Sequence, residues 1–200
     1  MEGFRTTLIN CRECNRRILV RAADAERGTI ICSHIGCGAL NTLQAGFYYD
    51  ETIVQGLPGF GHLTYLDKPE KTYLLQFGSN ILGTSDSCTI QIDRFMHNDR
   101  CFISRRHCTI TVTFDKWIGQ LRYQLQDGFI DSSTQQQQSS LNGTLLNGVL
   151  LQKNELIDVS IDGIISLGGA DRFQLTHYCI NPEMLNTYKI ELAFNPDRTQ

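Results

Sequence analysis

Residues 107–114 read HCTITVTF, a run in which every second side chain is apolar. Because successive side chains of a β-strand point to opposite faces of a sheet, this alternation predicts a strand. We expect Cys108, Ile110, Val112 and Phe114 to face a core, and the three threonines between them to face outward.

Similar short runs continue on both sides of this strand, from Leu63 to Tyr178, and turn residues separate them. Many short strands divided by turn signals are typical of an all-β sandwich. No stretch has the spacing of a long amphipathic helix. The predicted fold class is therefore mainly β, an antiparallel β-sandwich, with further strands expected at 72–77, 88–92, 120–126, 143–147, 156–161, 164–168 and 172–178.

The composition is that of a soluble globular protein. The chain has 200 residues, 41% of them hydrophobic, and a formal net charge of −3. No apolar stretch approaches the roughly 18 residues that a membrane span needs, and the first residues, MEGFRTTLIN, lack the apolar run of a secretory signal. We therefore expect a cytoplasmic protein with no membrane partner.

Four of the eight cysteines lie near the start of the chain, in the pattern C-x2-C-x17-C-x4-C formed by Cys11, Cys14, Cys32 and Cys37. Two close cysteine pairs about twenty residues apart match a structural zinc site, because each pair aims two thiolates at one tetrahedral ion. A segment this short cannot fold on its apolar side chains alone, and a structural zinc ion can contribute about 10–16 kcal/mol. We predict one structural zinc ion bound by these four residues.

The text NCRECNRRILV…GTIICSHIGCGAL resembles a zinc ribbon, a small domain of two such cysteine turns on short antiparallel strands. The resemblance is imperfect, because the later pair has four residues between its cysteines where the family usually has two. His34 lies between them and is an alternative ligand to one cysteine, and a disulfide pair or free thiols remain further alternatives. We expect a structural or protein-contact role, with nucleic-acid binding as the alternative.

Four segments of the later chain are informative together: NILGTSDSCTIQID at 80–93, ISRRHCTI at 103–110, SSLNGTLLNGVLL at 139–151 and IDGIISLGG at 161–169. In this order they resemble the forkhead-associated (FHA) domain, a β-sandwich family that binds phosphothreonine peptides. The resemblance implies an FHA-like sandwich that serves as a non-enzymatic adaptor between proteins. It also implies a phosphothreonine-containing partner protein and a Ser/Thr kinase in the same cell.

The resemblance assigns roles to individual residues. The hydroxyl of Ser104 is expected to donate to the phosphate, and the neighbouring Arg105 to add a charge-assisted bond. His107 is expected to brace the binding loop, while Asn142 bonds the peptide backbone and Gly143 supports the turn. We predict no catalytic residues, because Ser104 and His107 are local neighbours and no nucleophile elbow surrounds them.

The first departure from the family lies at Gly83 and Thr84. Most members follow this supporting glycine with an arginine that contacts the phosphate, whereas Thr84 offers a neutral hydroxyl. One charge-assisted bond, worth about 1.5–3 kcal/mol, is then missing unless Arg106 or Arg100 replaces it. This departure supports one alternative, a phospho-independent scaffold. A second alternative, nucleic-acid binding, is led by the zinc ribbon.

The second departure is the polar segment before Asn142. If Asp131 corresponds to the family's aspartate, the usual step of five residues to the asparagine has become eleven, and it now includes Gln135 to Gln138. We expect an exposed loop inserted between two strands. It is interpreted as a tolerated surface insertion, with an enlarged peptide contact as the alternative.

These patterns divide the chain into four parts. Residues 1–44 carry six Lys/Arg against four Asp/Glu, whereas the remaining residues carry twelve against seventeen. The stretch at residues 45–62, where the charge changes sign, contains several Gly and Pro residues that would interrupt a long helix or strand. We predict a zinc ribbon at 1–44, a linker at 45–62, the sandwich at 63–178 and a tail at 179–200, which could form a short helix or one more strand.

Overall fold

A computed structural model describes residues 7–43, 47–131 and 133–191 of the chain. The chain divides into two compact units, which we describe separately: Met1–Asp50 together with Thr187–Gln200, and Glu51–Asn186. Within the described residues, no helix combines the length and the apolar character needed to cross a bilayer.

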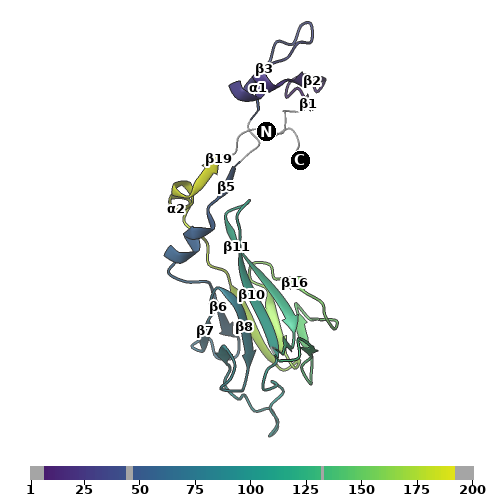
Figure 1. Ribbon diagram of the computed structural model, residues 1–200. Helices are drawn as coiled ribbons and strands as arrows, with labels where there is room; N and C mark the ends of the chain where they lie inside the picture. The colour runs from purple at the N-terminus through teal and green to yellow at the C-terminus, as the bar shows by residue number, and fades with distance from the viewer. Residues whose placement is uncertain (1–6, 44–46, 132, 192–200) are drawn as a thin grey trace. The chain divides into compact units, whose positions relative to one another are not determined.

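The first unit is built from two short antiparallel hairpins (Figure 1). β1 (Thr7–Asn10) pairs with β2 (Arg17–Val20), and β3 (Thr29–Ile31) pairs with β4 (Leu40–Thr42). The one-and-a-half-turn helix α1 (Ala22–Arg27) connects the hairpins and ends at Gly28, whose φ of 67° suits a residue without a side chain. Each hairpin turn carries one of the two cysteine pairs.

A third strand pair in this unit joins residues from the two ends of the chain. β5 (Phe47–Tyr49) pairs antiparallel with β19 (Lys189–Glu191). The ammonium of Lys189 lies 4.0 Å from the ring centre of Phe47, and the amide of Asp50 donates to the carbonyl of Tyr188 at 2.8 Å. The segment expected to be a linker therefore begins with a paired strand, and the expected tail supplies its partner.

The second unit begins with the 3₁₀-helix η1 (Glu51–Gly56), whose Ile53 is fully buried, and ends with helix α2 (Pro182–Thr187). Both expectations for the tail, a helix and a strand, are therefore met by α2 and β19. The predicted domain boundaries at residues 44, 62 and 178 remain predictions. Helices or strands of the structure lie on both sides of each boundary.

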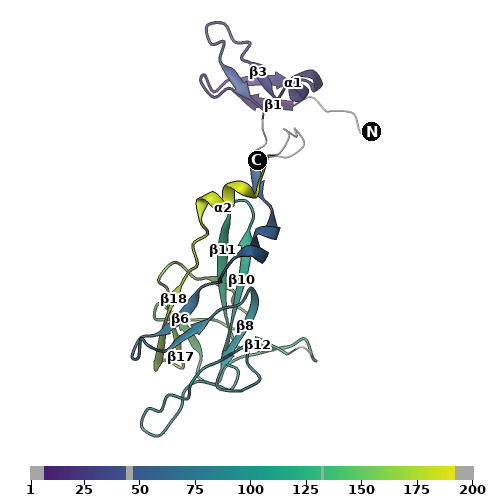
Figure 2. The same cartoon turned by 90° about the vertical axis from the view of Figure 1, so that its left-hand side faces the viewer.

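Two antiparallel sheets pack face to face between these elements (Figure 2). The five-stranded sheet has the order β16-β11-β10-β8-β9, and the six-stranded sheet has the order β15-β14-β17-β18-β6-β7. Among the strand pairs of the described residues, β8–β9 alone is parallel. The strands are β6 (His62–Tyr65), β7 (Thr72–Leu74), β8 (Gly78–Gly83), β9 (Ile90–Gln91), β10 (Cys108–Asp115), β11 (Gln120–Asp127), β14 (Thr144–Leu146), β15 (Val149–Leu150), β16 (Ile157–Asp158), β17 (Ile164–Leu167) and β18 (Asp171–Thr176). The mainly β sandwich predicted from the sequence is confirmed.

Strand β10 tests the predicted alternation directly. Cys108, Ile110 and Val112 are fully buried as expected, whereas Phe114, close to the hairpin end of the strand, is only half-buried. Thr109 was expected to face solvent and is instead buried. Its hydroxyl donates to the carbonyl of Gly128 at 2.8 Å, because the chain after β11 covers this part of the sheet.

The stretch before Asn142 is mostly exposed, as predicted, but it is not a loop throughout. It contains a small hairpin, β12 (Phe129–Ile130) paired with β13 (Gln137–Gln138), and Phe129 is buried. A Cβ on Gly128 would lie 1.8 Å from the carbonyl oxygen of Gln138, so only glycine allows the two strands to meet here. The polar stretch therefore forms a small paired hairpin whose turn is exposed.

Candidate functional site

Two loops lie side by side at one end of the sandwich and form the frame of the site. The amides of Thr84 and Ser85 donate to the carbonyls of Ser104 and Arg105 at 3.1 and 3.0 Å. A Cβ on Gly83 would lie 2.2 Å from the Arg105 carbonyl oxygen. Any side chain at position 83 would therefore push the loops apart, which gives Gly83 a structural role.

His107 connects these loops to a third one. Its ring is fully buried; Nδ1 accepts the amide of Ser104 at 2.9 Å, and Nε2 lies 3.0 Å from the Gly143 carbonyl. Because Nδ1 accepts, the ring proton is on Nε2, which donates to that carbonyl. Burial lowers the pKa of His107 below its usual value, so the ring is neutral and serves as a brace.

The two side chains expected to contact a peptide are both held in place by the backbone. The Ser104 hydroxyl oxygen accepts the amide of Leu141 at 3.0 Å, so its hydrogen remains available for a ligand. The Asn142 amide nitrogen donates to the carbonyl of Phe102 at 2.8 Å, and no described residue donates to its side-chain oxygen. Gly143 follows with a φ of 77°, a conformation that glycine adopts without strain.

The carboxylate of Asp127 holds the Asn142 turn in place, and the sequence analysis did not identify this residue. Its buried carboxylate accepts the amide and hydroxyl of Ser140 at 3.1 and 2.7 Å and the hydroxyl of Thr144 at 2.7 Å. The carboxylate therefore fixes both sides of the Asn142 turn. A patterned strand that ends in an acid just before a glycine was the available signal.

Asp131, proposed from sequence as the aspartate of this loop, does not contact the Asn142 turn. It lies in the turn of the β12–β13 hairpin, where it accepts the amide and hydroxyl of Ser133 and the side-chain amide of Gln138. The hydrogen bonds from Ser133, together with the positive charge of Arg106, hold the pKa of Asp131 below its ordinary value. Its carboxylate stabilises the hairpin that the insertion forms.

An open cavity of about 730 Å³ lies between these loops. It brings together four of the residues expected to bind a ligand, Thr84, Ser104, Arg105 and Arg106. Asn142 and Arg100 do not belong to its lining. Asp131 and Gln138, from the stretch expected before Asn142, also line the cavity. The lining residues that the sequence analysis did not identify are Ser85, Ser87, Arg94, Cys101, Ile103, Phe129, Ser139, Ser140 and Leu141.

The positive charge in this cavity exceeds the negative charge. Three arginines line it, with Asp131 as the one lining carboxylate. Arg106 is held in place, because its Nε and Nη2 each lie 3.3 Å from the Ser87 hydroxyl and its guanidinium lies 4.9 Å from the ring centre of Phe129. The guanidinium of Arg105 has no hydrogen-bond or ion-pair partner among the described residues. Guanidinium groups next to a free hydroxyl suit a phosphate-like anion.

A protein-family model matches the part of the chain that forms this cavity. The family model described as FHA domain matches residues 77–168, which include the whole five-stranded sheet, strands β14, β15 and β17 of the other sheet, and all loops of the cavity. This part of the chain is an FHA domain. No curated protein sequence matches the chain.

Solved FHA domains are similar in structure. The MEK1 FHA domain, solved in complex with a HOP1 peptide, is 21% identical and has a TM-score of 0.45; the alignment covers 60% of this chain and 99% of that one. An FHA domain from Chlamydia trachomatis is 19% identical with a TM-score of 0.43, again covering 60% and 99%. A domain from a study of phosphothreonine-dependent FHA interactions gives 21% and 0.43, with the same coverage.

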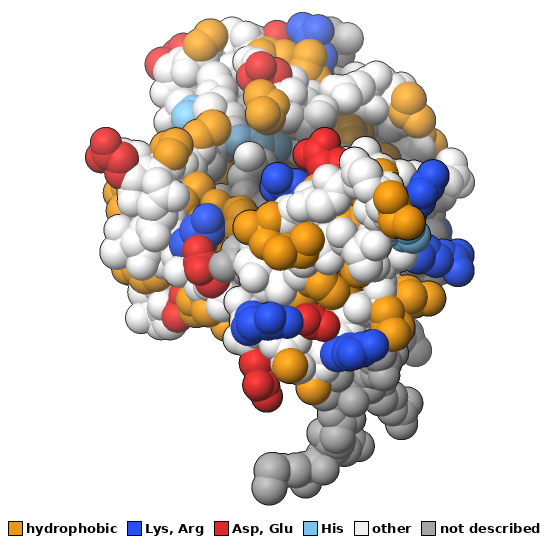
Figure 3. Space-filling view, turned by 90° about the horizontal axis from the view of Figure 1, so that it is seen from above, with side chains coloured by type: hydrophobic (Ala, Val, Ile, Leu, Met, Phe, Trp, Pro, Cys, Tyr) orange, Lys and Arg blue, Asp and Glu red, His pale blue; other side chains and the backbone are white. Residues whose placement is uncertain are grey.

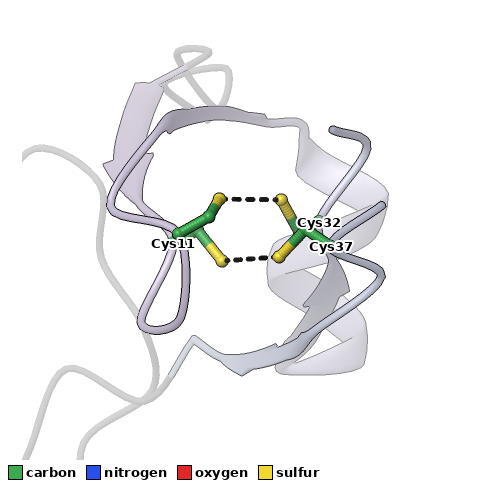
Figure 4. Close-up of side chains that lie close together, drawn as sticks. Cys11, Cys32 and Cys37 are labelled. Carbon is green, nitrogen blue, oxygen red and sulfur yellow. Dashed lines mark hydrogen bonds between the residues drawn. The ribbon is translucent and has the colours of Figure 1, made fainter. Parts of the chain in front are cut away.

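Outside the FHA domain, the four predicted cysteine ligands form a cluster at the hairpin turns (Figure 4). The sulfur atoms of Cys11 and Cys37 lie 3.6 Å apart, those of Cys14 and Cys32 lie 3.8 Å apart, and all four lie within 4.8 Å of one another. A tetrahedral ion with bonds of about 2.3 Å places its sulfur ligands about 3.8 Å apart. The cluster therefore has the dimensions of a four-coordinate metal site.

The electrostatics of the four thiols also fit a metal. Amide donation from Cys14 lowers the pKa of Cys11 to about 6. The amide of His34 favours the thiolate of Cys32, but burial and the neighbouring thiols outweigh it and raise that pKa to about 12. Four thiolates this close repel one another unless a cation lies between them. His34 itself lies outside the cluster, with Nε2 3.0 Å from the Arg17 carbonyl.

Proposed function

We propose that this chain is a phosphothreonine-dependent adaptor, in which the FHA domain docks a phosphorylated segment of a partner protein. The observation that supports this best is the cavity in which the Ser104 hydroxyl and the guanidiniums of Arg105 and Arg106 lie together. A phosphate carries about −1.5 to −2 charges at neutral pH and three strong acceptor oxygens, so it can use all three donors. The proposal implies a Ser/Thr kinase in the same cell.

In this proposal Ser104 and Arg105 bind the phosphate, and Arg106 replaces the arginine that most family members carry at the position of Thr84. Arg106 is suited to this role because Ser87 and Phe129 already hold its guanidinium at the cavity. An ordered side chain loses less conformational entropy on binding. Thr84 then contributes only a neutral hydroxyl.

Three further residues, Asn142, His107 and Gly143, act on the peptide and the loops. Asn142, fixed through Phe102, offers its free side-chain oxygen to an amide of the extended peptide. His107 and Gly143 keep the Ser104 and Asn142 loops in register through the bond between the ring and the Gly143 carbonyl. Both loops would otherwise have to order on binding.

We propose that the cysteine cluster holds one structural zinc ion in a zinc ribbon. Zinc fits better than harder cations because four thiolates form the donor set. When bound, the ion would cross-link the two hairpins, and the chain's own contribution is to aim Cys11, Cys14, Cys32 and Cys37 at one point. A protein-contact or structural role suits this ribbon, since its residues 7–43 contain no Phe, Tyr or Trp on which a base could stack.

The face drawn in Figure 3 does not have the charge pattern of a nucleic-acid surface. On the face drawn in Figure 3, Lys and Arg side chains are scattered among acidic and apolar ones. Proteins that bind nucleic acid through its phosphates concentrate their basic residues in a patch or stripe. We therefore prefer the phosphopeptide adaptor to this alternative.

Calorimetric titration with a degenerate phosphothreonine peptide pool, run beside the same pool without phosphate, tests the proposal. We expect micromolar binding to the phosphorylated pool alone. Binding to neither pool would favour the phospho-independent scaffold.

The Ser104→Ala variant tests whether the cavity is the binding site. We expect it to weaken phosphopeptide binding by about 1–3 kcal/mol, as loss of a hydrogen bond to a charged group should. Thermal stability should change little, because the Leu141 amide that loses its acceptor belongs to an exposed residue and can bond water. An unchanged affinity would remove Ser104 from the site.

A further inference from the structure

Arg94 is a cation of the cavity for which the proposed phosphate contacts leave no role. It follows β9 in the chain, is exposed and lines the same cavity as Arg105 and Arg106. Its guanidinium has no hydrogen-bond or ion-pair partner among the described residues. The neighbouring Asp93 does not neutralise it, because that carboxylate pairs with Lys71 at 2.8 Å and accepts the hydroxyl of Tyr73.

The other charges of the cavity are already accounted for. Arg106 is held by Ser87 and Phe129, and Arg105 adjoins the Ser104 hydroxyl, so these two can neutralise one phosphate dianion. Arg94 reaches the cavity from a different segment of the chain. Its charge remains available for a second anion.

We propose that Arg94 binds a second anionic group of the same peptide, an acidic or phosphorylated side chain that flanks the phosphothreonine. This inference rests on the proposed function and names the class of partner segment: an acidic one. The chemistry is that of a guanidinium with a carboxylate or phosphate, which form charge-assisted hydrogen bonds with equal ease. An exposed arginine without a carboxylate partner provides such a contact without breaking one.

Asp131, the acidic residue that lines the cavity, does not give the site a preference for a basic flanking residue. Asp131 might be expected to attract a basic flanking residue, but Ser133 and Gln138 already donate to both of its carboxylate oxygens. A peptide lysine would have to compete with these bonds and with the nearby charge of Arg106. The unpartnered groups of the cavity are cations, so the selected flank is anionic.

The test is a peptide series titrated against the full chain. The reference peptide has one phosphothreonine with alanines around it, and each further peptide places a single glutamate at one flanking position. We expect one position to tighten binding roughly three- to tenfold over the reference. The Arg94→Ala variant should lose that gain and still bind the reference peptide as the unmodified chain does.

Arg100→Ala is the matched control, because Arg100 lies in the same loop and does not line the cavity. It should keep the glutamate preference. Replacing the effective glutamate with phosphoserine identifies the natural anion: a larger gain that Arg94→Ala removes assigns a second phosphate, and an equal gain assigns a carboxylate.

Two results would overturn the inference. One is a series in which no flanking glutamate improves binding, and the other is an Arg94→Ala variant that weakens the glutamate and alanine peptides by the same factor. If the reference peptide itself does not bind to the unmodified chain, the proposed function fails and this inference fails with it.

Discussion

The two hairpins of the first unit and the sandwich of the second solve the problem of a stable core in opposite ways. Around the cysteine cluster, the buried hydrophobic residues are the proposed metal ligands Cys11 and Cys32 together with Ile18. The sandwich instead buries whole apolar side chains such as Tyr123 and Phe173. In the proposed zinc ribbon, folding is coupled to metal binding, whereas the sandwich has an apolar core of its own.

Removal of the metal should break this contrast most strongly. We expect a chelator, or Cys11→Ser, to unfold residues 7–43, since a structural zinc site contributes about 10–16 kcal/mol to folding. Amide NMR spectra should lose the dispersed signals of β1 to β4 and keep those of the sandwich. Cys179→Ser, at an exposed cysteine outside the cluster, should change neither. Unchanged β1 to β4 signals after complete metal removal would refute a structural ion.

The sandwich should have its own weak point at Asp127. Replacement with alanine leaves the amide and hydroxyl of Ser140 and the hydroxyl of Thr144 without their acceptor, and we expect a loss of about 3 kcal/mol in the free energy of unfolding. Urea denaturation measures it. Asp131→Ala should cost less than about 1 kcal/mol, because that carboxylate bonds within its own hairpin. Equal losses would show that the Asn142 turn does not depend on Asp127.

Arg106→Ala should affect the finished cavity rather than the fold. We expect phosphopeptide binding to weaken by about 1.5–3 kcal/mol, as loss of one charge-assisted bond should, with little change in melting temperature. Calorimetric titration beside a melting curve separates the two effects. A variant that melts early but binds normally when folded would assign Arg106 to the packing of Phe129 instead.

The neutral His107 should make the sandwich sensitive to mild acid. Its pKa is lowered in the folded state, so the unfolded chain binds the proton more readily; stability is full above the unfolded pKa near 6.5 and falls as the pH drops below it. We expect a loss on the order of 1 kcal/mol between about pH 7.5 and 5.5. His177, whose pKa burial also lowers, contributes in the same direction. Ring NMR signals that show His107 titrating at or above 6.5 would contradict this.

The smallest effect is expected from Thr84→Arg. If Arg106 already supplies the missing cation, the added guanidinium should tighten phosphopeptide binding by less than about 0.5 kcal/mol. In the Arg106→Ala background the same change should recover a larger part of the lost affinity. A large gain in the unmodified chain would show that the cavity lacks its main phosphate contact.

Sequence patterns predicted features that a local stretch of chain encodes. The alternation of residues 107–114 gave strand β10, and the spacing of the four cysteines gave their cluster. Strand β8 was missed because it begins with the polar run Gly78, Ser79 and Asn80. Asn80 is fully buried there, and its side-chain amide donates to the carbonyls of Gln76, Gly78 and Ile110. These hydrogen bonds form only in the folded sheet, so the sequence does not show them.

The candidate site divides in the same way. Ser104, Arg105 and Asn142 were predicted from motifs, because each lies in a short recognisable stretch. Arg94 and Asp127 were not predicted, since they lie in other stretches of the chain that meet these motifs only in space. The composition of the glutamine-rich stretch likewise concealed the β12–β13 hairpin, whose order depends on long-range contacts with β10.

Because β5 pairs with β19, the chain enters and leaves the second unit at neighbouring points, and the unit could be inserted as one piece into another protein. The chain enters that unit after Tyr49 and leaves it before Lys189, and these two residues are direct partners across the strand pair. Paired Cα atoms of antiparallel strands lie about 5 Å apart. Residues 51–186 could therefore be transplanted into a surface loop of an unrelated host, provided that the ends of that loop are no farther apart than the two strands of a hairpin.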